Sequence, residues 1–268
     1  MTLTLDVQRF DPQAGQPPRM QRYEVAVEPT DRLIDVLLKI KSEQDATLSF
    51  RYSCAHGVCG SDAMRINGTE RLACRTLVRD LFPDAAAGGG VPEGQAARSP
   101  VTVEPLRHLP VLRDLVVDQR PFFQNILKVS PFLLPAQKDR TDGKETLQTQ
   151  QQQAQFEDAT KCISCGACFS ACPVLEKNPR FIGPAAIVQA ARFVEDSRDW
   201  GLAPRLDALD TPDGVWACEN HFECTRVCPR EIKVTKLINL MKRRVTAERE
   251  KRGETVHQGP DGGAAKGS

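Results

Sequence analysis

The ten cysteines constrain this chain most, because they fall into three groups and none lies outside a group. The N-terminal residues Met1–Phe10 alternate polar and apolar side chains without the apolar core of a signal peptide. In a protein that stays in a reducing compartment, grouped cysteines are more often metal ligands than disulfide partners. We therefore expect metal sites. The groups are Cys54, Cys59 and Cys74; Cys162, Cys165, Cys168 and Cys172; and Cys218, Cys224 and Cys228.

The second group has the spacing of bacterial ferredoxins, C-x2-C-x2-C-x3-C-P, and ends at Cys172-Pro173. In that run three thiolates hold one cubane cluster and the fourth ligates the other cluster. The third group repeats the frame, except that His221 stands where the second cysteine is expected. The crossed pattern predicts a [4Fe–4S] cluster on Cys162, Cys165, Cys168 and Cys228. It predicts a [3Fe–4S] cluster on Cys172, Cys218 and Cys224.

Two alternatives remain open at these runs. Structural zinc also takes grouped thiolates, although two matching runs with prolines in register favour iron–sulfur clusters. The imidazole of His221 could complete a cubane as a fourth ligand, but a lone histidine near a metal more often hydrogen-bonds or packs.

The first group predicts a [2Fe–2S] site with one unusual ligand. Cys54-x4-Cys59 opens a plant-type loop, whose next ligand is expected at position 62, and Cys74 completes the set. Position 62 holds Asp62, whose carboxylate can replace a thiolate on iron. The alternative is that Asp62 only hydrogen-bonds and that water or Ser61 ligates. His56 in the same loop either tunes the cluster or is a solvated loop residue.

Two domains with different periodicities surround the cysteines. Alternating residues at 3–7 and 23–27, joined by a loop over 11–18, predict strands. Thr30 or Asp31 is expected to cap a helix over 33–40. The turn Asn67-Gly68 is expected between strands at 63–66 and 71–76, with Cys74 on the second, and residues 101–103 add a strand. Helical spacing dominates after 156, notably over 185–194 and 234–248.

We therefore predict an α+β protein with a first domain over residues 1–107 and a helical domain over 108–250. The Ala- and Gly-rich stretch 84–99 is expected to be a mobile loop, and 251–268 a disordered tail. Residues 141–155 are polar and predict a surface segment or a helix start.

The charge and hydropathy of the chain exclude other classes of protein. A formal net charge of +1 argues against a nucleic-acid partner, because no basic excess is present to neutralise phosphates. No apolar run approaches the roughly 20 residues that span a bilayer. We expect a soluble polypeptide in the cytosol.

The order of these sites resembles the iron–sulfur subunit of the succinate dehydrogenase/fumarate reductase family over roughly residues 3–245. Some members of that family also carry Asp at the position of Asp62. Further stretches that carry the resemblance are Asp35–Asp45, Ser53–Ser61, Leu72–Cys74, Phe181–Ala185 and Asp196–Asp199.

The resemblance implies a β-grasp plant-type ferredoxin domain followed by an all-α bacterial-ferredoxin-like domain. It implies a respiratory complex II in which a flavoprotein subunit with covalent FAD oxidises succinate or reduces fumarate. Electrons then pass through the [2Fe–2S], [4Fe–4S] and [3Fe–4S] clusters to a quinone at a membrane anchor, with or without haem. The subunit is expected at the cytoplasmic side of the inner (plasma) membrane, peripheral through the anchor. The chain carries no dicarboxylate site of its own, so no catalytic residue is assigned.

One departure from the family bears on the quinone. Many ubiquinone-reducing relatives have a Ser and then a Trp after the position of Pro173, where this chain has Val174–Lys177. They often have His where this chain has Glu219. The departure favours menaquinone over ubiquinone. Competing functions are a free two-domain ferredoxin-like carrier, against which the helices after Cys228 argue, and a zinc-stapled interaction protein.

Overall fold

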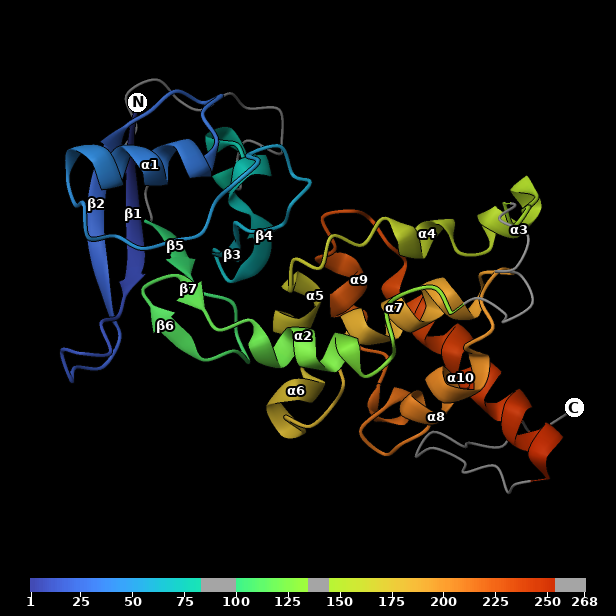
Figure 1. The fold of residues 1–268 in the computed structure, drawn as a ribbon. Coiled ribbons are helices and arrows are strands. Elements are labelled where there is room, and N and C mark those ends of the chain that lie inside the picture. The colour runs from blue at the N-terminus through green and yellow to red at the C-terminus, as the bar shows by residue number, and fades with distance from the viewer. Residues whose placement is uncertain (83–99, 135–144, 254–268) are drawn as a thin grey trace, which may run out of the picture. The chain divides into compact units, whose positions relative to one another are not determined.

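The computed structural model describes residues 1–82, 100–134 and 145–253 (Figure 1). The predicted loop at 84–99 and most of the predicted tail lie outside the described residues. The chain divides into two compact units. What we call the N-terminal unit comprises Met1–Gln124, Cys162–Cys172 and Glu223–Ile232. The helical unit comprises Asn125–Lys161, Pro173–Phe222 and Lys233–Ser268. The domain boundary expected near residue 107 stays a prediction, since the N-terminal unit continues past it.

A mixed sheet forms one layer of the N-terminal unit, in the strand order β2-β1-β5-β3-β4. β1 pairs antiparallel with β2 and parallel with β5, whereas β3 pairs antiparallel with both of its neighbours. Side chains in these strands alternate between buried and exposed, as expected for a sheet with one packed face. The strands are β1 (Thr2–Arg9), β2 (Arg19–Ala26), β3 (Ala63–Ile66), β4 (Thr69–Leu72) and β5 (Val101–Glu104). The sequence did not predict the small hairpin of β6 (Val111–Arg113) and β7 (Val116–Val117).

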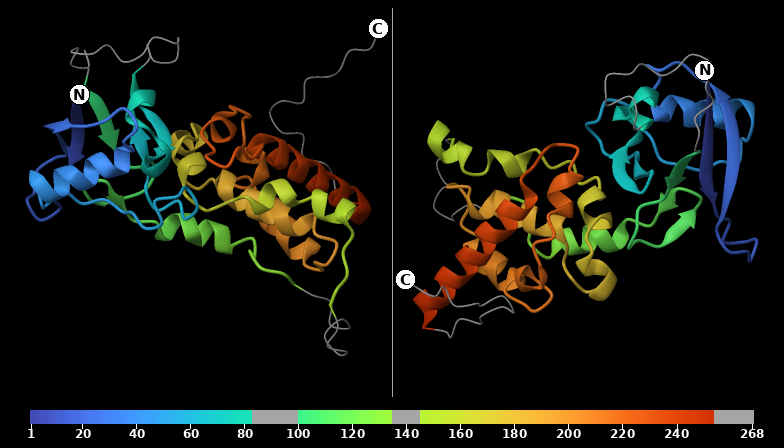
Figure 2. Two further views of the ribbon diagram at one scale, coloured as in Figure 1. Left: turned by 90° about the horizontal axis from the view of Figure 1, so that it is seen from above. Right: turned by 180° about the vertical axis from the view of Figure 1, so that it is seen from behind.

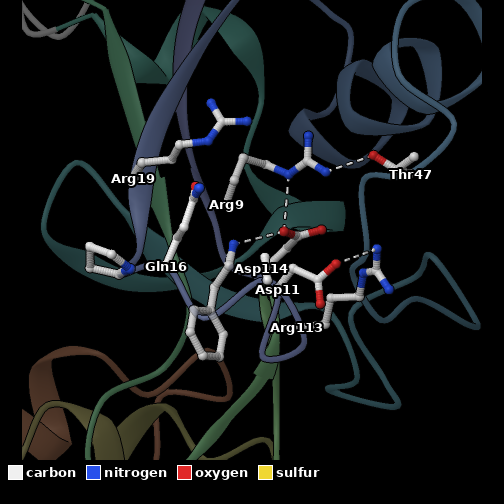
Figure 3. Close-up of a pocket in the computed structure, with 10 residues that line it drawn as sticks. Arg9, Asp11, Gln16, Arg19, Thr47, Arg113 and Asp114 are labelled. Atoms are coloured by element: carbon white, nitrogen blue, oxygen red, sulfur yellow. Dashed lines mark hydrogen bonds and ion pairs between the residues drawn. The ribbon is translucent and has the colours of Figure 1, made fainter.

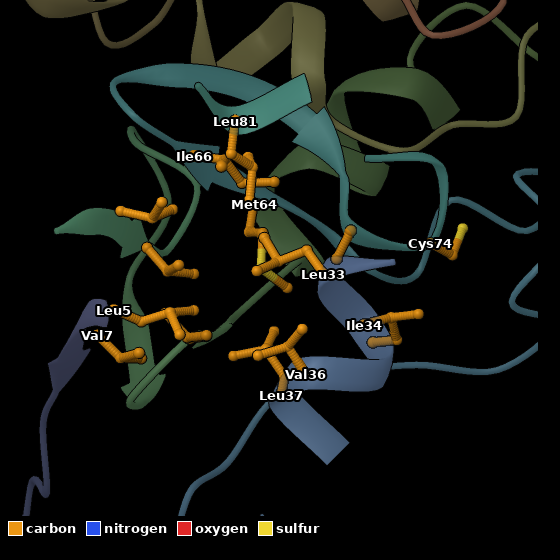
Figure 4. Packing of buried hydrophobic residues seen from close by; sticks show 14 of the residues in the cluster. Leu5, Val7, Leu33, Ile34, Val36, Leu37, Met64, Ile66, Cys74 and Leu81 are labelled. Atoms are coloured by element: carbon orange, nitrogen blue, oxygen red, sulfur yellow. The ribbon is translucent and has the colours of Figure 1, made fainter. Parts of the chain in front are cut away.

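Helix α1 (Leu33–Glu43) packs on this sheet and closes the core. Figure 4 shows Leu33 of the helix beside Met64, and Ile34 on the side of the helix that lies toward Cys74. The predicted cap at Thr30 or Asp31 is wrong. Arg32 is the N-cap, because the Asp35 carboxylate accepts its backbone N–H at 3.2 Å. The α+β class of the unit is as predicted.

The chain after β4 differs from the prediction of a strand through Thr76. Strand β4 ends at Leu72, and Ala73–Arg75 form a turn of 3₁₀ helix that carries Cys74. The Ala73 N–H still donates to the Asp62 carbonyl at 3.1 Å, in register with the pairing of β3 and β4. The next N–H, that of Cys74, donates instead to the Asp62 carboxylate at 2.6 Å, which holds the backbone in the turn.

The helical unit is built around α7 (Pro184–Val194), α8 (Leu202–Leu209) and α10 (Val234–Arg252), which pack against one another (Figures 1 and 2). α7 agrees with the predicted helix, and α10 continues four residues beyond the predicted end to a left-handed Gly253. In the described residues, no helix has the length and hydropathy to cross a membrane. The shorter helices of the chain are α2 (Arg120–Leu127), α3 (Gln150–Ala154), α4 (Glu157–Thr160), α5 (Ala167–Ser170), α6 (Val174–Lys177) and α9 (Glu223–Arg226).

A buried ion pair fixes the loop before α8 in the helical unit. The side chains of Arg205 and Asp199 are 0% and 1% exposed and form an ion pair. Arg205 also donates to the carbonyls of Ser130 and Phe132, the latter at 2.7 Å, and Asp199 accepts the Gly201 N–H at 2.7 Å. A buried charge is tolerated only when it is paired and hydrogen-bonded in this way.

Candidate metal centres

The first site is a tight loop after α1 that surrounds the sulfur of Cys54. Ala55, Gly57 and Gly60 have positive φ angles of 54°, 71° and 69°, so the backbone curls on itself. The Cys54 Sγ accepts the N–H groups of His56 and Cys59, each at 3.4 Å. These bonds, with the Cys59 thiol, lower the pKa of Cys54 to about 6. A thiolate is the form that binds metal, so the loop is prepared for a metal before one arrives.

Asp62 and Cys74 face each other on the other side of this site. The side chain of Asp62 is buried, and its carboxylate is bonded to the Cys74 N–H. Burial, and then the Asp62 carboxylate, raise the pKa of the Cys74 thiol to about 12. Figure 4 shows Cys74 at the margin of the hydrophobic cluster. A carboxylate has about four lone-pair positions, so this bond is compatible with either role of Asp62.

Two further side chains support the first loop: Arg32, which the sequence analysis did not weigh, and Ser61, which it weighed as an alternative ligand. Arg32 donates from Nη1 to the Ala55 carbonyl at 2.8 Å. The Ser61 hydroxyl lies 3.2 Å from the Cys59 sulfur. His56 is exposed and its Nδ1 contacts the Cys54 carbonyl, so its ring belongs to the loop surface. No sequence pattern points to Arg32, because its partner lies 23 residues away.

The second site gathers four cysteines of the N-terminal unit around α5. Gly166, with a φ of 83°, caps α5 and turns the run from Cys165 towards Cys168. Burial raises the pKa of Cys165 to about 12, and the nearby Cys162 and Cys228 add to the shift. The pKa of Cys168 is raised well above its usual value by burial, and Cys165, Cys162, Cys224 and Cys228 add to it. Crowded thiols of this kind are stabilised by cations, which deprotonate them on binding.

The first and second sites meet at a glycine. A Cβ on Gly60 would lie 2.5 Å from the Cβ of Cys165 and 3.0 Å from its Cα, closer than packed atoms approach. Only glycine therefore lets the loop after Cys59 lie directly on the loop that carries Cys165. Both loops belong to the N-terminal unit.

The three cysteines of the third predicted site are divided between the two compact units. Cys172 and Cys224 lie in the N-terminal unit and are 7% and 8% exposed. Cys218 belongs to the helical unit, where its carbonyl accepts the Lys242 ammonium at 2.8 Å. The three-thiolate site therefore stays a prediction.

His221 takes part in a surface network of the helical unit. Its Nε2 lies 2.8 Å from the Glu219 carboxylate, which Lys177 also contacts at 3.2 Å. First His221 and then Lys177 lower the pKa of Glu219. The His221 side chain is 40% exposed, which fits the hydrogen-bonding role better than iron ligation.

A site for a single metal ion would bring three or more ligating side chains to one point. In residues 1–82, 100–134 and 145–253, no three His, Cys, Asp or Glu side chains converge on the position of a single ion. In an iron–sulfur cluster the cysteines are distributed over several irons, each thiolate binding one of them. The ligand sulfurs therefore lie further apart than the ligands of a single ion.

A pocket of about 310 Å³ in the N-terminal unit lies at the end of β1, and no cysteine lines it (Figure 3). Two of its three arginines, Arg9 and Arg113, are paired with carboxylates, and the third, Arg19, donates to Gln21. Arg9 contacts Asp114 at 3.0 Å and Thr47 at 2.8 Å, and Arg113 lies 3.5 Å from Asp11. These pairs tie β1 to the segment around Asp114, so we interpret the pocket as a structural network.

Comparisons with known proteins identify iron–sulfur domains in both halves of the chain. Residues 4–124 match the family described as "2Fe-2S iron-sulfur cluster binding domain", and residues 158–232 match "4Fe-4S dicluster domain". The fumarate reductase iron–sulfur subunit of Mycobacterium tuberculosis is 40% identical, with 86% of this chain and 87% of that protein covered. The succinate dehydrogenase iron–sulfur subunit of Coxiella burnetii is 36% identical, with 92% and 99% covered. A chain of the Mycobacterium smegmatis Sdh1 complex in the apo form superposes with a TM-score of 0.78 at 28% identity, covering 93% of this chain and 97% of that chain.

Proposed function

This chain belongs to the iron–sulfur subunits of the succinate dehydrogenase/fumarate reductase family, and from that premise we propose how its residues carry electrons. It is an electron-transfer subunit of an oxidoreductase complex and has no dicarboxylate site of its own. Iron–sulfur clusters take up and release single electrons, which divides the two-electron chemistry of a flavin into separate steps. The chain must therefore hold its clusters close together and shield them from water.

The proposed ligands follow from the two sites in the N-terminal unit and from the crossed cysteine frames. Cys54, Cys59, Asp62 and Cys74 hold a [2Fe–2S] cluster, and the N–H groups around Cys54 stabilise its charge. The contact of Gly60 with Cys165 supports a short path to the second site. The [4Fe–4S] ligands are Cys162, Cys165, Cys168 and Cys228, and the [3Fe–4S] ligands are Cys172, Cys218 and Cys224.

The partners follow from the family. We propose a flavoprotein subunit with FAD as electron donor or acceptor, and a membrane anchor that holds this subunit at the cytoplasmic face of the inner membrane. The quinone lies between this subunit and the anchor, and Val174–Lys177 and Glu219 favour menaquinone. The haem content of the anchor and the direction of the reaction depend on the partners and on the quinone potential.

The single observation that carries the proposal is the packing of the Cys165 loop directly on Gly60, which places two thiol sites in one compact unit. The test is to purify the chain with its partners and to measure iron and low-temperature EPR. We expect about nine irons per chain, a [3Fe–4S] signal when oxidised and a [2Fe–2S] signal when reduced. Zinc in place of iron, or an oxidised protein without the [3Fe–4S] signal, would contradict the assignments. Purification without a flavoprotein would favour a free carrier.

A further inference from the structure

Arg75 lies between the first two cluster sites. It follows Cys74 directly and ends the 3₁₀ turn after β4. Its aliphatic stem lies on Gly57, because a Cβ at Gly57 would contact the Arg75 Cδ and would lie 2.8 Å from its Cγ. Gly57 is buried and has a φ of 71°, a left-handed conformation that favours glycine. Because glycine has no side chain, the Arg75 stem can lie directly on the loop backbone. The stem of Arg75 therefore covers the backbone of the first loop.

The other end of the Arg75 side chain reaches the second site. Its Nη1 donates to the carbonyl of Pro229 at 3.0 Å, across 154 positions of sequence. Pro229 follows Cys228, the thiol that completes the second site in the proposed assignment. All of these residues belong to the N-terminal unit. One side chain thus contacts the backbone of both loops.

Arg32 provides a matched comparison within the same unit. Its guanidinium also holds the first loop, through the Ala55 carbonyl, but its other side-chain hydrogen bonds within the described part of the chain go to the Asp35 carboxylate in the first turn of α1. Arg32 and Arg75 therefore place similar charges beside the first site, and only Arg75 bonds the turn of the second.

We propose that Arg75 is a positioning residue that ties the loop carrying Cys54 and Cys59 to the turn carrying Cys228. The inference rests on the ligand assignment of the proposed function. The stem fixes the first loop by packing, and the guanidinium fixes the Pro229 carbonyl by a charge-assisted hydrogen bond. The consequence is that the two sites keep a constant separation, on which the rate of electron transfer between them depends.

The test compares Arg75→Met with Arg32→Met in the purified complex by hydrogen–deuterium exchange. Met keeps much of the apolar stem and removes the donor, and Arg22→Met controls for the loss of an exposed charge on β2. In Arg75→Met we expect exchange to rise in both 54–60 and 226–232, by between about twofold and tenfold, the range of one net hydrogen bond. In Arg32→Met it rises in 54–60 alone, and in Arg22→Met in neither.

A second measurement reads the separation of the sites. In fully reduced complex, the magnetic interaction between the two clusters broadens their EPR signals and weakens with distance. In Arg75→Met we expect a wider spread of this broadening, because the separation of the clusters varies. In Arg32→Met we expect the broadening of the unmodified complex. If Arg75→Met loses its clusters, Arg75→Lys replaces it, because an ammonium keeps the charge without the planar fork of donors. It is expected to raise exchange in both segments by a smaller factor.

The proposal is overturned if exchange in 226–232 is unchanged in both Arg75 variants. It is also overturned if Arg32→Met raises exchange in 226–232 as much as Arg75→Met. Exchange is compared only among variants that keep the iron content of the unmodified complex, so the comparison does not depend on which cluster type fills each site. Iron analysis and EPR of the unmodified complex therefore test the proposed function separately from the role of Arg75.

Discussion

Replacing Gly60 by alanine tests the closest contact between the first two sites. Alanine at a φ of 69° costs about 1–2 kcal/mol in the left-handed region. Its Cβ would also lie 2.5 Å from the Cys165 Cβ, and overpacking of a buried site costs about 1–3 kcal/mol more. Gly68→Ala is the control, because Gly68 has a φ of 75° and its nearest contact for a Cβ is the end of Arg65 at 3.9 Å. The difference between the variants therefore isolates the clash.

The assay is the rate at which visible absorbance is lost at raised temperature with an iron chelator. A rate is appropriate because the loss of a cluster is irreversible. If the contact is released in the transition state, 1–3 kcal/mol accelerates the loss of clusters by between about fivefold and a hundredfold in Gly60→Ala relative to Gly68→Ala. Equal rates in the two variants would refute the reasoning, because the clash would then cost nothing.

Three further substitutions test single features. Asp62→Ala should make the [2Fe–2S] cluster labile and Asp62→Cys should keep it with a changed EPR line shape or potential; an Ala variant with unchanged spectrum and potential would leave Asp62 as a hydrogen-bond acceptor alone. His221→Cys should reduce the [3Fe–4S] EPR signal and succinate–quinone activity, while succinate oxidation with an acceptor at the flavin survives; a full [3Fe–4S] signal in this variant would contradict the three-ligand frame. Arg205→Met leaves the buried Asp199 without its cation and should cost about 3–5 kcal/mol, seen as a lower midpoint of thermal unfolding; a midpoint equal to that of the unmodified chain would mean that backbone N–H groups alone satisfy Asp199.

Periodic elements and local motifs were predictable from the sequence. The alternation in β1 and the helical spacing of α7 and α10 reflect which side chains are buried, so these elements lie close to where they were expected. β2 was also expected, but it begins at Arg19, four residues before the predicted start. The short spacings between the cysteines likewise predicted the loops that carry them. These features depend on residues that are near one another in the chain.

Features that depend on distant partners were not predictable. The turn at Cys74 depends on a carboxylate 12 positions earlier, and the hairpin turn Asn67-Gly68 alone favoured a strand there. The loop glycines could be explained as places where the backbone curls, but Gly60 also makes room for Cys165, 105 positions away. Nothing in the local sequence marks Arg75 as a partner of Pro229.

The N-terminal unit is built from three separate segments of the chain, which affects the order in which its sites are completed during synthesis. Its sheet and first loop are complete once Gln124 has been synthesised, but the unit also needs Cys162–Cys172 and Glu223–Ile232. Until the first of these segments is made, Glu70 of β4 lacks the Ser170 hydroxyl that it holds at 2.7 Å in the finished protein. A nascent chain on the ribosome can therefore shape the first site early, whereas the second waits for Cys228, which is synthesised 104 residues after Gln124. Iron delivered to this chain during synthesis would then fill its sites in the order in which the ribosome completes them.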